Sequence, residues 1–339
     1  MIVVDSDLAG VTPPARTLMT MNRRNLLQSS AMLLLSAGLP ISAFARSRRG
    51  SFWGKDGPGV QLYALEPDLK RDLDGTLAKV AALGIRSVEI ASMHGRTPAQ
   101  MRAALDKAGL RCHSVHVAAS SSVPGASGLT FDDLGKLCDD LATLGASDAV
   151  LPLFQTPKGA AWGEPIPFVA LVRPGPPAIG ADRYARMADF LNQAGAVLKA
   201  KGIAIGYHNH NFELAPLGDK TGLQILIEKT DPAIVRFEID TGWIAAAGQD
   251  PVAWLQRYPG RFKQMHVKDI KASTVPNFHL RQDPTEVGSG KMDWPRILPA
   301  ALASGVQRFF VEQDPPFAGP RIDAITKSMA YLSTLSVAR

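Results

Sequence analysis

The sequence predicts an α/β fold, a single (β/α)8 TIM barrel with an N-terminal export signal. From residue 59 onward, short apolar segments typical of strands alternate eight times with helix-like segments. Eight such repeats favour a closed parallel barrel over an open sheet. A doubly wound open sheet is the alternative, but no glycine-rich phosphate loop follows the first apolar segment. The length of 339 residues suits one barrel of about 250 residues plus a leader.

The start of the chain has the features of an export signal. Arg23 and Arg24 follow Met21, and a mostly apolar region covers 31–43. The sequence Ala-Phe-Ala at 43–45 then fits the small-x-small pattern of a cleavage site. The paired arginines followed by Asn-Leu-Leu resemble a twin-arginine leader, which predicts a periplasmic or secreted protein. An ordinary secretory signal is the alternative.

The apolar region of this leader is too short to remain in a bilayer as a permanent helix. We therefore expect no stable membrane span after cleavage, and the sequence leaves an uncleaved anchor open. The residues before Met21 do not resemble a signal, so Met21 is the expected true start. These features divide the chain into a leader with the export signal over 1–45, a linker over 46–58 and the barrel over 59–339.

The distribution of charge argues against a nucleic-acid partner. The formal net charge of +6 at first suggests one. Six arginines against two aspartates place four of these charges within residues 1–50, so the remaining body carries about +2. A nearly neutral body lacks the basic surface that phosphate binding needs.

The first half of the barrel region shows a regular alternation of strands and helices. A glycine follows each of its three predicted helices, where a C-cap glycine belongs. Cys112 on a strand and Cys138 on a helix form no motif, and whether they pair is left open. The predicted strands are Val60–Leu65, Ser87–Ala91, Arg111–Ala118 and Asp148–Phe154, and the predicted helices are Asp74–Leu83, Pro98–Ala108 and Phe131–Leu144.

Residues 155–181 interrupt this alternation, because they are rich in proline and glycine. We interpret them as a long loop at the barrel mouth that could act as a lid. The second half then resumes the pattern. Its strand-like segments are the one that begins at Ile203 and ends at His208, within the stretch Ile203–Glu213, and Val235–Asp240, Phe262–Asp269 and Phe309–Asp314. Its predicted helices are Asp182–Ala200, Gly222–Lys229, Pro251–Tyr258, Trp294–Ala303 and Ile322–Leu335.

Each of these four later strands ends in side chains of the types that bind metals. The carboxyl ends of parallel barrel strands meet at one mouth, so these side chains can converge on one divalent ion. A mixed set of nitrogen and oxygen ligands suits Mn²⁺, Co²⁺, Fe²⁺ or Zn²⁺. The alternative is four separately satisfied buried polar groups, but clustered ionisable groups call for a partner. The predicted ligands are His208, Asp240, His266 and Glu312.

Five motifs together resemble the sugar phosphate isomerase/epimerase family of xylose-isomerase-like barrels. The resemblance covers roughly residues 59–335 and is most specific in the second half. It implies one divalent metal at the barrel mouth, held by strands five to eight, and carboxylates that move a proton beside the carbonyl of a keto sugar. The motifs are Gly206–Glu213 (GYHNHNFE), Phe237–Trp243 (FEIDTGW), Met265–Asp269 (MHVKD), Glu286–Trp294 (EVGSGKMDW) and Phe310–Asp314 (FVEQD).

The chain departs from the family pattern at the fifth strand. Many epimerases of the family have a glutamate there that is both ligand and acid/base group, whereas this chain has His208. One base would then come from Glu312, His210, Glu89 or His116. The resemblance associates the subgroup with histidine at this metal position with 3-keto-glycosides, through epimerisation or β-elimination of the aglycone. An exported location also favours a glycoside over a sugar phosphate.

The other candidate residues surround this metal site. Lys268 either stabilises an oxyanion or pairs with a mouth carboxylate such as Glu238 or Asp269. Glu89 and His116 face the mouth if the strand alternation holds, and they either touch the substrate or support the site. The predicted catalytic residues are Glu312, Lys268, His210 and Glu89, and the predicted substrate-binding residues are His116, Glu286, Trp243 and Tyr63.

These residues predict a metal-dependent sugar isomerase or epimerase whose partner is a small-molecule carbohydrate. Metal coordination makes the C–H beside a ketone more acidic, and a positioned base removes that proton. A 3-keto-glycoside lyase or hydrolase working by β-elimination is the alternative, and a non-catalytic sugar-binding barrel is a third. The apurinic endonuclease branch of this barrel is disfavoured, because Trp243 stands where that branch has a histidine. A homo-oligomer is left open.

Overall fold

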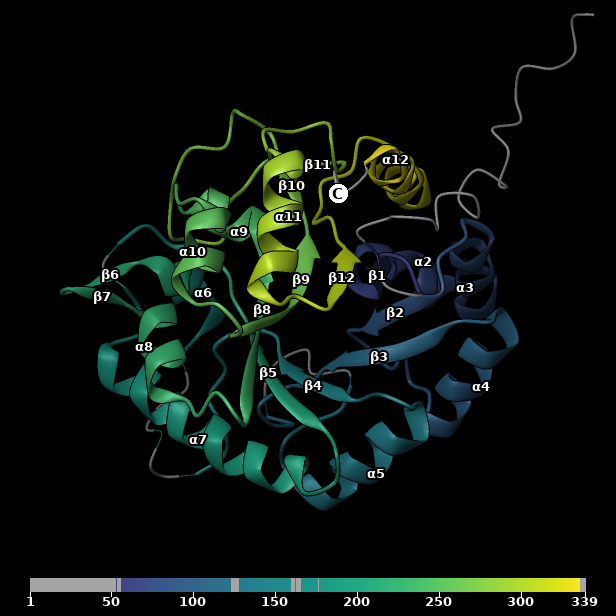
Figure 1. Cartoon of the computed structure of the whole chain (residues 1–339). Helices are drawn as coiled ribbons and strands as arrows, with labels where there is room; N and C mark the ends of the chain where they lie inside the picture. Colours follow the sequence, from purple (N-terminus) through teal and green to yellow (C-terminus); the bar gives the residue numbers. More distant parts are fainter. Residues whose placement is uncertain are drawn as a thin grey trace, which may run out of the picture. The chain divides into compact units, whose positions relative to one another are not determined.

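Eight parallel strands form a closed barrel, so the predicted fold class is confirmed (Figure 1). The computed structural model describes residues 53, 56–122, 128–159, 162, 166–175 and 177–335. The predicted export signal lies outside these residues. Around the barrel the strands follow their order in the sequence, and β1 closes the ring by pairing with β12. The barrel strands are β1 Gly59–Gln61, β2 Ser87–Ile90, β3 Arg111–His116, β4 Asp148–Leu151, β5 Ala204–His208, β8 Val235–Asp240, β9 Phe262–Val267 and β12 Arg308–Val311.

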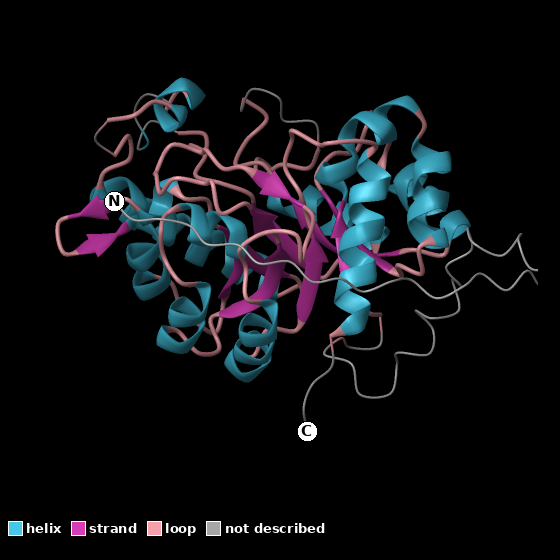
Figure 2. Ribbon diagram, turned by 90° about the horizontal axis from the view of Figure 1, so that it is seen from above, coloured by secondary structure: helices cyan, strands magenta, loops and turns pink. Residues whose placement is uncertain are grey.

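Helices surround these strands, as Figure 2 shows. The helices that connect successive strands, together with the one after the last strand, pack against the outside of the barrel, as the (β/α)8 fold requires. They are α2 Glu66–Arg71, α3 Leu73–Ala82, α4 Pro98–Ala108, α5 Leu134–Leu144, α7 Ala181–Lys199, α8 Gly222–Lys229, α10 Pro251–Arg257, α11 Trp294–Ser304 and α12 Arg321–Thr334. Shorter elements are the 3-10 helices η2 Leu62–Leu65 and η4 Phe212–Leu214, the helices α6 Phe168–Val172 and α9 Thr241–Ala246, and the strand pairs β6 Pro216–Leu217 with β7 Lys220–Thr221 and β10 Asp269–Ile270 with β11 Pro284–Thr285.

Local sequence sets the ends of several helices. The Thr97 hydroxyl accepts the backbone N–H of Gln100, and the Gln100 side chain accepts the N–H of Thr97, so a capping box begins α4. α4 and α5 end at Gly109 and Gly145, with φ of 70° and 75°. Glycine adopts this left-handed conformation without the strain that a Cβ would cause, which explains why it occurs at these two ends.

The first strand is shorter than predicted. β1 ends at Gln61, whose side-chain oxygen accepts the N–H of Tyr63 at 3.0 Å and turns the chain into η2. Tyr63 therefore projects from a 3-10 helix after the strand and not from the strand itself. The predicted loop over 155–181 contains the short helix α6, and β3 and β4 end before the predicted Ala118 and Phe154.

A buried carboxylate forms ion pairs at the amino-terminal ends of the barrel strands. Asp148 begins β4 and is buried, and its carboxylate lies 2.5 Å from an Nη of Arg308 and 3.4 Å from an Nη of Arg236. Arg308 also donates to the hydroxyl of Ser147, which in turn donates to Asp148. The buried carboxylate at this end thus has partners within the protein.

The structure shows whether the two cysteines pair and whether a described helix could cross a membrane. Cys112 and Cys138 are buried and free, so they do not pair with each other. In the described part of the chain, no helix is both long and apolar enough to cross a membrane.

Candidate metal centre at the barrel mouth

The four predicted metal ligands lie on neighbouring strands at the carboxyl end of the barrel. β5 ends at His208 and β8 at Asp240, His266 lies in β9 opposite Asp240, and Glu312 directly follows β12. His208 Nε2 lies 3.7 Å from Asp240 Oδ2. His266 Nδ1 lies 3.7 Å from the same oxygen and 2.8 Å from Oε2 of Glu312. The structure therefore brings these four buried side chains together.

A fifth side chain, Glu238, belongs to the same cluster. Its Oε2 lies 3.0 Å from His208 Nδ1 and 3.1 Å from Nε2 of both His266 and His116. Glu238 was not among the predicted ligands, although its position two residues before Asp240, on the same strand face, was an available signal. The donor atoms form two groups within 4.8 Å, which are His116, His208, Glu238 and His266, and Asp240, His266 and Glu312.

The chemistry and an unsatisfied oxygen of this cluster fit a divalent cation. Glu238 Oε1 is buried and accepts no hydrogen bond from any described residue, whereas Asp240 Oδ2 forms an ion pair with Lys268 at 2.9 Å. A buried carboxylate oxygen without a partner is costly, and a bound cation would remove that cost. Imidazole nitrogens and carboxylate oxygens are also the ligand types that first-row divalent metals accept. The cluster could therefore hold a metal.

His266 and Lys268 supply positive charge to these carboxylates. Burial alone would lower the pKa of His266, but Glu238 and Glu312 raise it well above its ordinary value. Burial would likewise raise the pKa of Glu312, but the charges of Lys268 and His266 hold it well below its usual range. Glu312 is therefore ionised at neutral pH and can act as a ligand.

Lys268 forms ion pairs with three mouth carboxylates. Its Nζ lies 2.9 Å from Asp240, 2.8 Å from Glu312 and 2.7 Å from Asp314. The lysine is buried, and burial acts to lower its pKa, but the three carboxylates raise that pKa well above the ordinary value. Of the partners considered from the sequence, Asp269 is engaged elsewhere, because it accepts the N–H of Gly288 and the indole N–H of Trp294.

Glu89 lies too deep in the barrel to contact a substrate in the mouth pocket. Its Oε2 lies 2.6 Å from His266 Nε2 and accepts the side-chain N–H of Gln61 at 2.8 Å, and its Oε1 accepts the hydroxyl of Ser114. It is fully buried and does not line the mouth pocket. His116 does line that pocket, so the structure separates two residues that the sequence treated alike.

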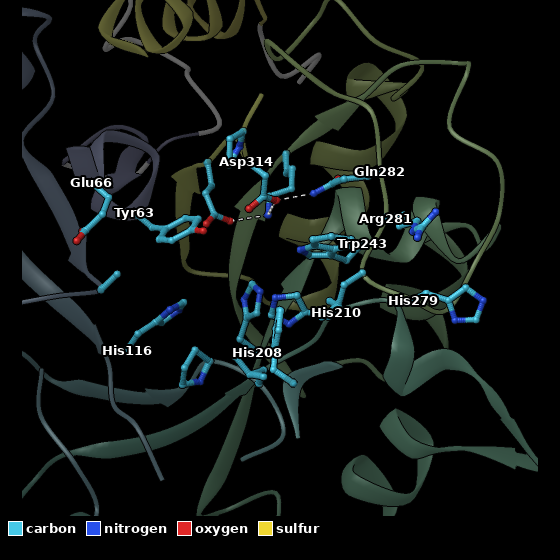
Figure 3. Close-up of a pocket in the computed structure, with 18 of the residues that line it drawn as sticks. Tyr63, Glu66, His116, His208, His210, Trp243, His279, Arg281, Gln282 and Asp314 are labelled. Carbon is cyan, nitrogen blue, oxygen red and sulfur yellow. Dashed lines mark hydrogen bonds and ion pairs between the residues drawn. The ribbon is translucent and has the colours of Figure 1, made fainter. Parts of the chain in front are cut away.

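His210, Trp243 and Tyr63 line the pocket at the barrel mouth, and Figure 3 labels all three. The volume of this pocket is about 1050 Å³. The ring of His210 lies 5.0 Å from that of His208 and 5.2 Å from that of Trp243. Its Nδ1 is buried and has no hydrogen-bond partner among the described residues. Burial, followed by the charges of His208 and Lys268, lowers the pKa of His210 well below its ordinary value. This imidazole is therefore neutral at pH 7.

Glu286 lies outside the pocket, contrary to the expectation that it binds substrate. Its carboxylate lies 3.1 Å from the Nζ of Lys327 and accepts the hydroxyl of Thr285. The loop after β9 instead brings Gln282 to the pocket, where its amide donates to Asp314 (Figure 3). Only the polar composition of this loop could have indicated such a contact, because the partner is distant in sequence.

Glu213 was also not singled out, although it ends the fifth-strand motif. It is fully buried and accepts the hydroxyl of Tyr207 and the N–H of His210, both at 2.8 Å. Burial raises its pKa to about 8. Glu213 thus fixes the backbone that carries both His208 and His210.

The described residues form a closed parallel barrel whose carboxyl end gathers histidines and carboxylates in a cluster that could hold a metal. Residues 77–335 match the family described as xylose isomerase-like TIM barrel. The chain belongs to this family, as its motifs predicted.

Solved structures and curated proteins include similar chains. A sugar phosphate isomerase/epimerase from Parabacteroides distasonis ATCC 8503 is 26% identical with a TM-score of 0.60, covering 81% of this chain and 93% of that one. The IOLI protein, solved with a zinc atom, is 14% identical with a TM-score of 0.58, covers 83% of this chain and 99% of that one, and shows the fold alone. An inosose dehydratase from Bacillus anthracis is 29% identical over 157 residues, 42% of this chain and 52% of that protein. The chain thus spans about half the length of these curated relatives.

Proposed function

We propose that this protein is a divalent-metal-dependent enzyme that transfers a proton beside the carbonyl of a keto sugar or 3-keto-glycoside, as isomerases and epimerases do. The observation that carries this proposal is the mouth cluster, in which histidines surround carboxylates and Glu238 Oε1 is buried without a partner among the described residues. The relatives described as sugar phosphate isomerase/epimerase and inosose dehydratase support a substrate of this type.

The residues that would hold the metal are the four predicted from the sequence, His208, Asp240, His266 and Glu312. One Mn²⁺, Co²⁺, Fe²⁺ or Zn²⁺ ion bound there would polarise the substrate carbonyl and make the neighbouring C–H more acidic. Lys268 keeps Asp240 and Glu312 ionised through its ion pairs, and its ammonium group can stabilise an oxyanion beside them. Glu89 fixes the orientation of His266 through Nε2.

His210 is the proposed proton acceptor. Its neutral imidazole faces the pocket, and its Nδ1 lacks a partner within the described residues. The other candidate bases already have partners. Glu89 is hydrogen-bonded to His266, and His116 is paired with Glu238. The proton leaves the carbon beside the carbonyl for Nδ1. Its return to the neighbouring carbon, with transfer of the hydroxyl proton of the first carbon to the former carbonyl oxygen, isomerises the sugar. Delivery of a proton from water to the opposite face of the same carbon, with release of the His210 proton to solvent, epimerises it.

A lyase or hydrolase that works by β-elimination is the second candidate, favoured by the inosose dehydratase relatives. It begins with the same transfer of a proton to His210. The electron pair left on the carbon then forms a C=C bond as the bond to the β-oxygen breaks, and that oxygen takes up a proton and leaves as water or an alcohol. The two candidates share the first step and differ in the fate of the electron pair.

Export to the periplasm or beyond the cell is also part of this proposal. It rests on the leader features around Arg23 and Arg24. An exported enzyme would meet neutral glycosides more often than phosphorylated sugars.

Exchange of the substrate α-proton with D₂O tests this function. Purified protein supplied with Mn²⁺, Co²⁺ or Zn²⁺ should exchange that proton in a panel of keto sugars and 3-keto-glycosides, followed by NMR. Glu312→Gln should lower the exchange rate by about a thousandfold or more, because it removes a ligand and a charge. Glu228→Gln, on the outer helix α8, is the matched control and should retain the rate. Metal and sugar binding without exchange would show a non-catalytic barrel instead.

A further inference from the structure

Exposed apolar side chains lie among polar ones at the rim of the mouth pocket, above its charged floor. Single exposed apolar side chains are ordinary on a protein surface, but a group of them at one opening indicates a binding surface. Three of the five large apolar residues that are exposed in the described part of the chain line this pocket. They are Tyr63, Phe168 and Val275, which are 42%, 64% and 75% exposed.

These three side chains come from three separate loops. Tyr63 lies in η2 after β1, Phe168 begins α6 in the long loop after β4, and Val275 lies in the loop over 271–283 that connects β10 to β11. The same pocket is also lined by Leu129, Leu153 and Leu280. The apolar part of the rim thus combines distant parts of the sequence around one opening.

The backbone that presents Val275 is held in place. Asn277 donates its side-chain N–H to the carbonyls of Val275 and Arg281, at 3.0 and 2.9 Å. Its backbone N–H donates to the carbonyl of Ala246, and the side chain of Asn211 donates to Asn277. A loop anchored in this way exposes Val275 as part of a fixed surface.

The size of the pocket exceeds what one sugar ring needs. Its volume is about 1050 Å³, at the upper end of the range of about 300–1000 Å³ that commonly buries drug-sized ligands. A sugar placed at the charged floor would leave the rim free. Two rim residues are aromatic, and aromatic side chains bind flat apolar groups by stacking and edge contacts.

We propose that Tyr63, Phe168 and Val275 form a subsite for an aromatic substituent, so that the preferred substrates are sugars that carry an aryl aglycone. This inference rests on the proposed function, which places the sugar ring at the charged floor. Burial of an aromatic ring against these three side chains removes apolar surface of both partners from water. Val169 and Val197 are exposed apolar residues that do not line the pocket, so they have no such role.

A pair of substrates that differ only in the aglycone tests the subsite. The probes are the 3-keto derivatives of phenyl β-D-glucoside and methyl β-D-glucoside, assayed with metal-loaded full-length protein. We expect kcat/KM to favour the phenyl compound by about tenfold or more. The double variant Phe168→Ser with Val275→Ser should lose most of this preference, so that its ratio of phenyl to methyl kcat/KM falls toward one. Val197→Ser, an exposed valine on α7, is the matched control and should change neither rate.

Binding of the unreactive phenyl and methyl β-D-glucosides, measured by calorimetry, separates this inference from the proposed function. If neither keto compound turns over but the protein binds the phenyl glucoside more tightly, and the double variant loses that difference, the subsite stands and the proposed chemistry fails. No preference for phenyl in either measurement overturns the subsite. A change in oligomeric state on the double substitution, measured by light scattering, also overturns it, because the rim would then be an interface between copies.

Discussion

The two ends of the barrel both bury carboxylates, but they neutralise them differently. At the amino-terminal end, Asp148 is matched by Arg308 and Arg236. At the mouth, Glu238, Asp240 and Glu312 gather around histidines and Lys268, and Glu238 Oε1 accepts no hydrogen bond from the described residues. The first arrangement is complete within the protein, whereas the second has room for a further cation.

This difference teaches which end supports the fold and which end supports chemistry. In (β/α)8 barrels the amino-terminal face contributes stability and the carboxyl face carries the site. Here the same residue types, buried acids, occur at both faces, so residue type alone does not separate the two roles. The two roles are separated by whether the buried acids have a complete set of partners within the protein.

Loss of a mouth carboxylate should have the largest effect on activity. Asp240→Asn removes one proposed ligand charge, so metal content should fall to about a tenth or less and turnover by about a thousandfold. Elemental analysis of the purified variant, with Glu228→Gln as the control, measures the metal content. If the variant retains its full metal content, the mouth carboxylates do not differ from Asp148 in binding a metal, and the contrast between the two ends fails.

Loss of the carboxylate at the opposite end should affect stability instead. Asp148→Asn leaves two arginines facing an uncharged amide, and we expect the free energy of unfolding to fall by about 2 kcal/mol, less than for a fully buried pair because Arg308 and Arg236 are partly exposed. Urea unfolding measures this change. Metal content should stay the same, and a loss of metal at unchanged stability would contradict this prediction.

Substitution of Glu213 should change the free energy of unfolding by an amount that depends on pH. Burial raises its pKa to about 8, from an ordinary 4.5, so the folded protein holds this proton more tightly than the unfolded chain. The resulting stabilisation is present below about pH 4.5 and is lost as the pH rises toward 8. Glu213→Gln removes the titration, so the variant should gain about 1–3 kcal/mol relative to wild type between about pH 5 and pH 8.

Unfolding measured for both proteins at these two pH values tests the prediction. Glu228→Gln serves as the control, because its exposed carboxylate pairs with Lys220 and has a lowered pKa. If the difference in stability between Glu213→Gln and wild type is the same at both pH values, Glu213 does not hold a proton in the folded state.

The barrel and the meeting of four strand ends could be predicted because they depend on local patterns. Strand direction and alternation, both visible in the sequence, place His208, Asp240 and His266 on one face at one end. The depth of a side chain depends on register, which the sequence does not display. The ladders shift at Val88/Glu89 and at Phe237/Glu238, so Glu89 and Glu238 both lie at β-sheet irregularities. Such irregularities redirect side chains, often beside active sites.

Contacts made by long loops were beyond sequence reasoning for a different reason. Gln282 reaches Asp314 across the mouth, whereas Glu286, a few residues further on, turns away to Lys327. Both are polar residues of similar size in the same connection. Only the path of the loop decides between them.

The way Asn277 anchors its loop has a consequence for redesign. Its hydrogen bonds, together with those of Asn211, involve mostly main-chain atoms of the loop and leave the side chains of Val275, His279 and Arg281 uncommitted to holding its shape. Those three positions can therefore be randomised as a library while the two asparagines are kept. Such a library would explore new ligands on an unchanged scaffold.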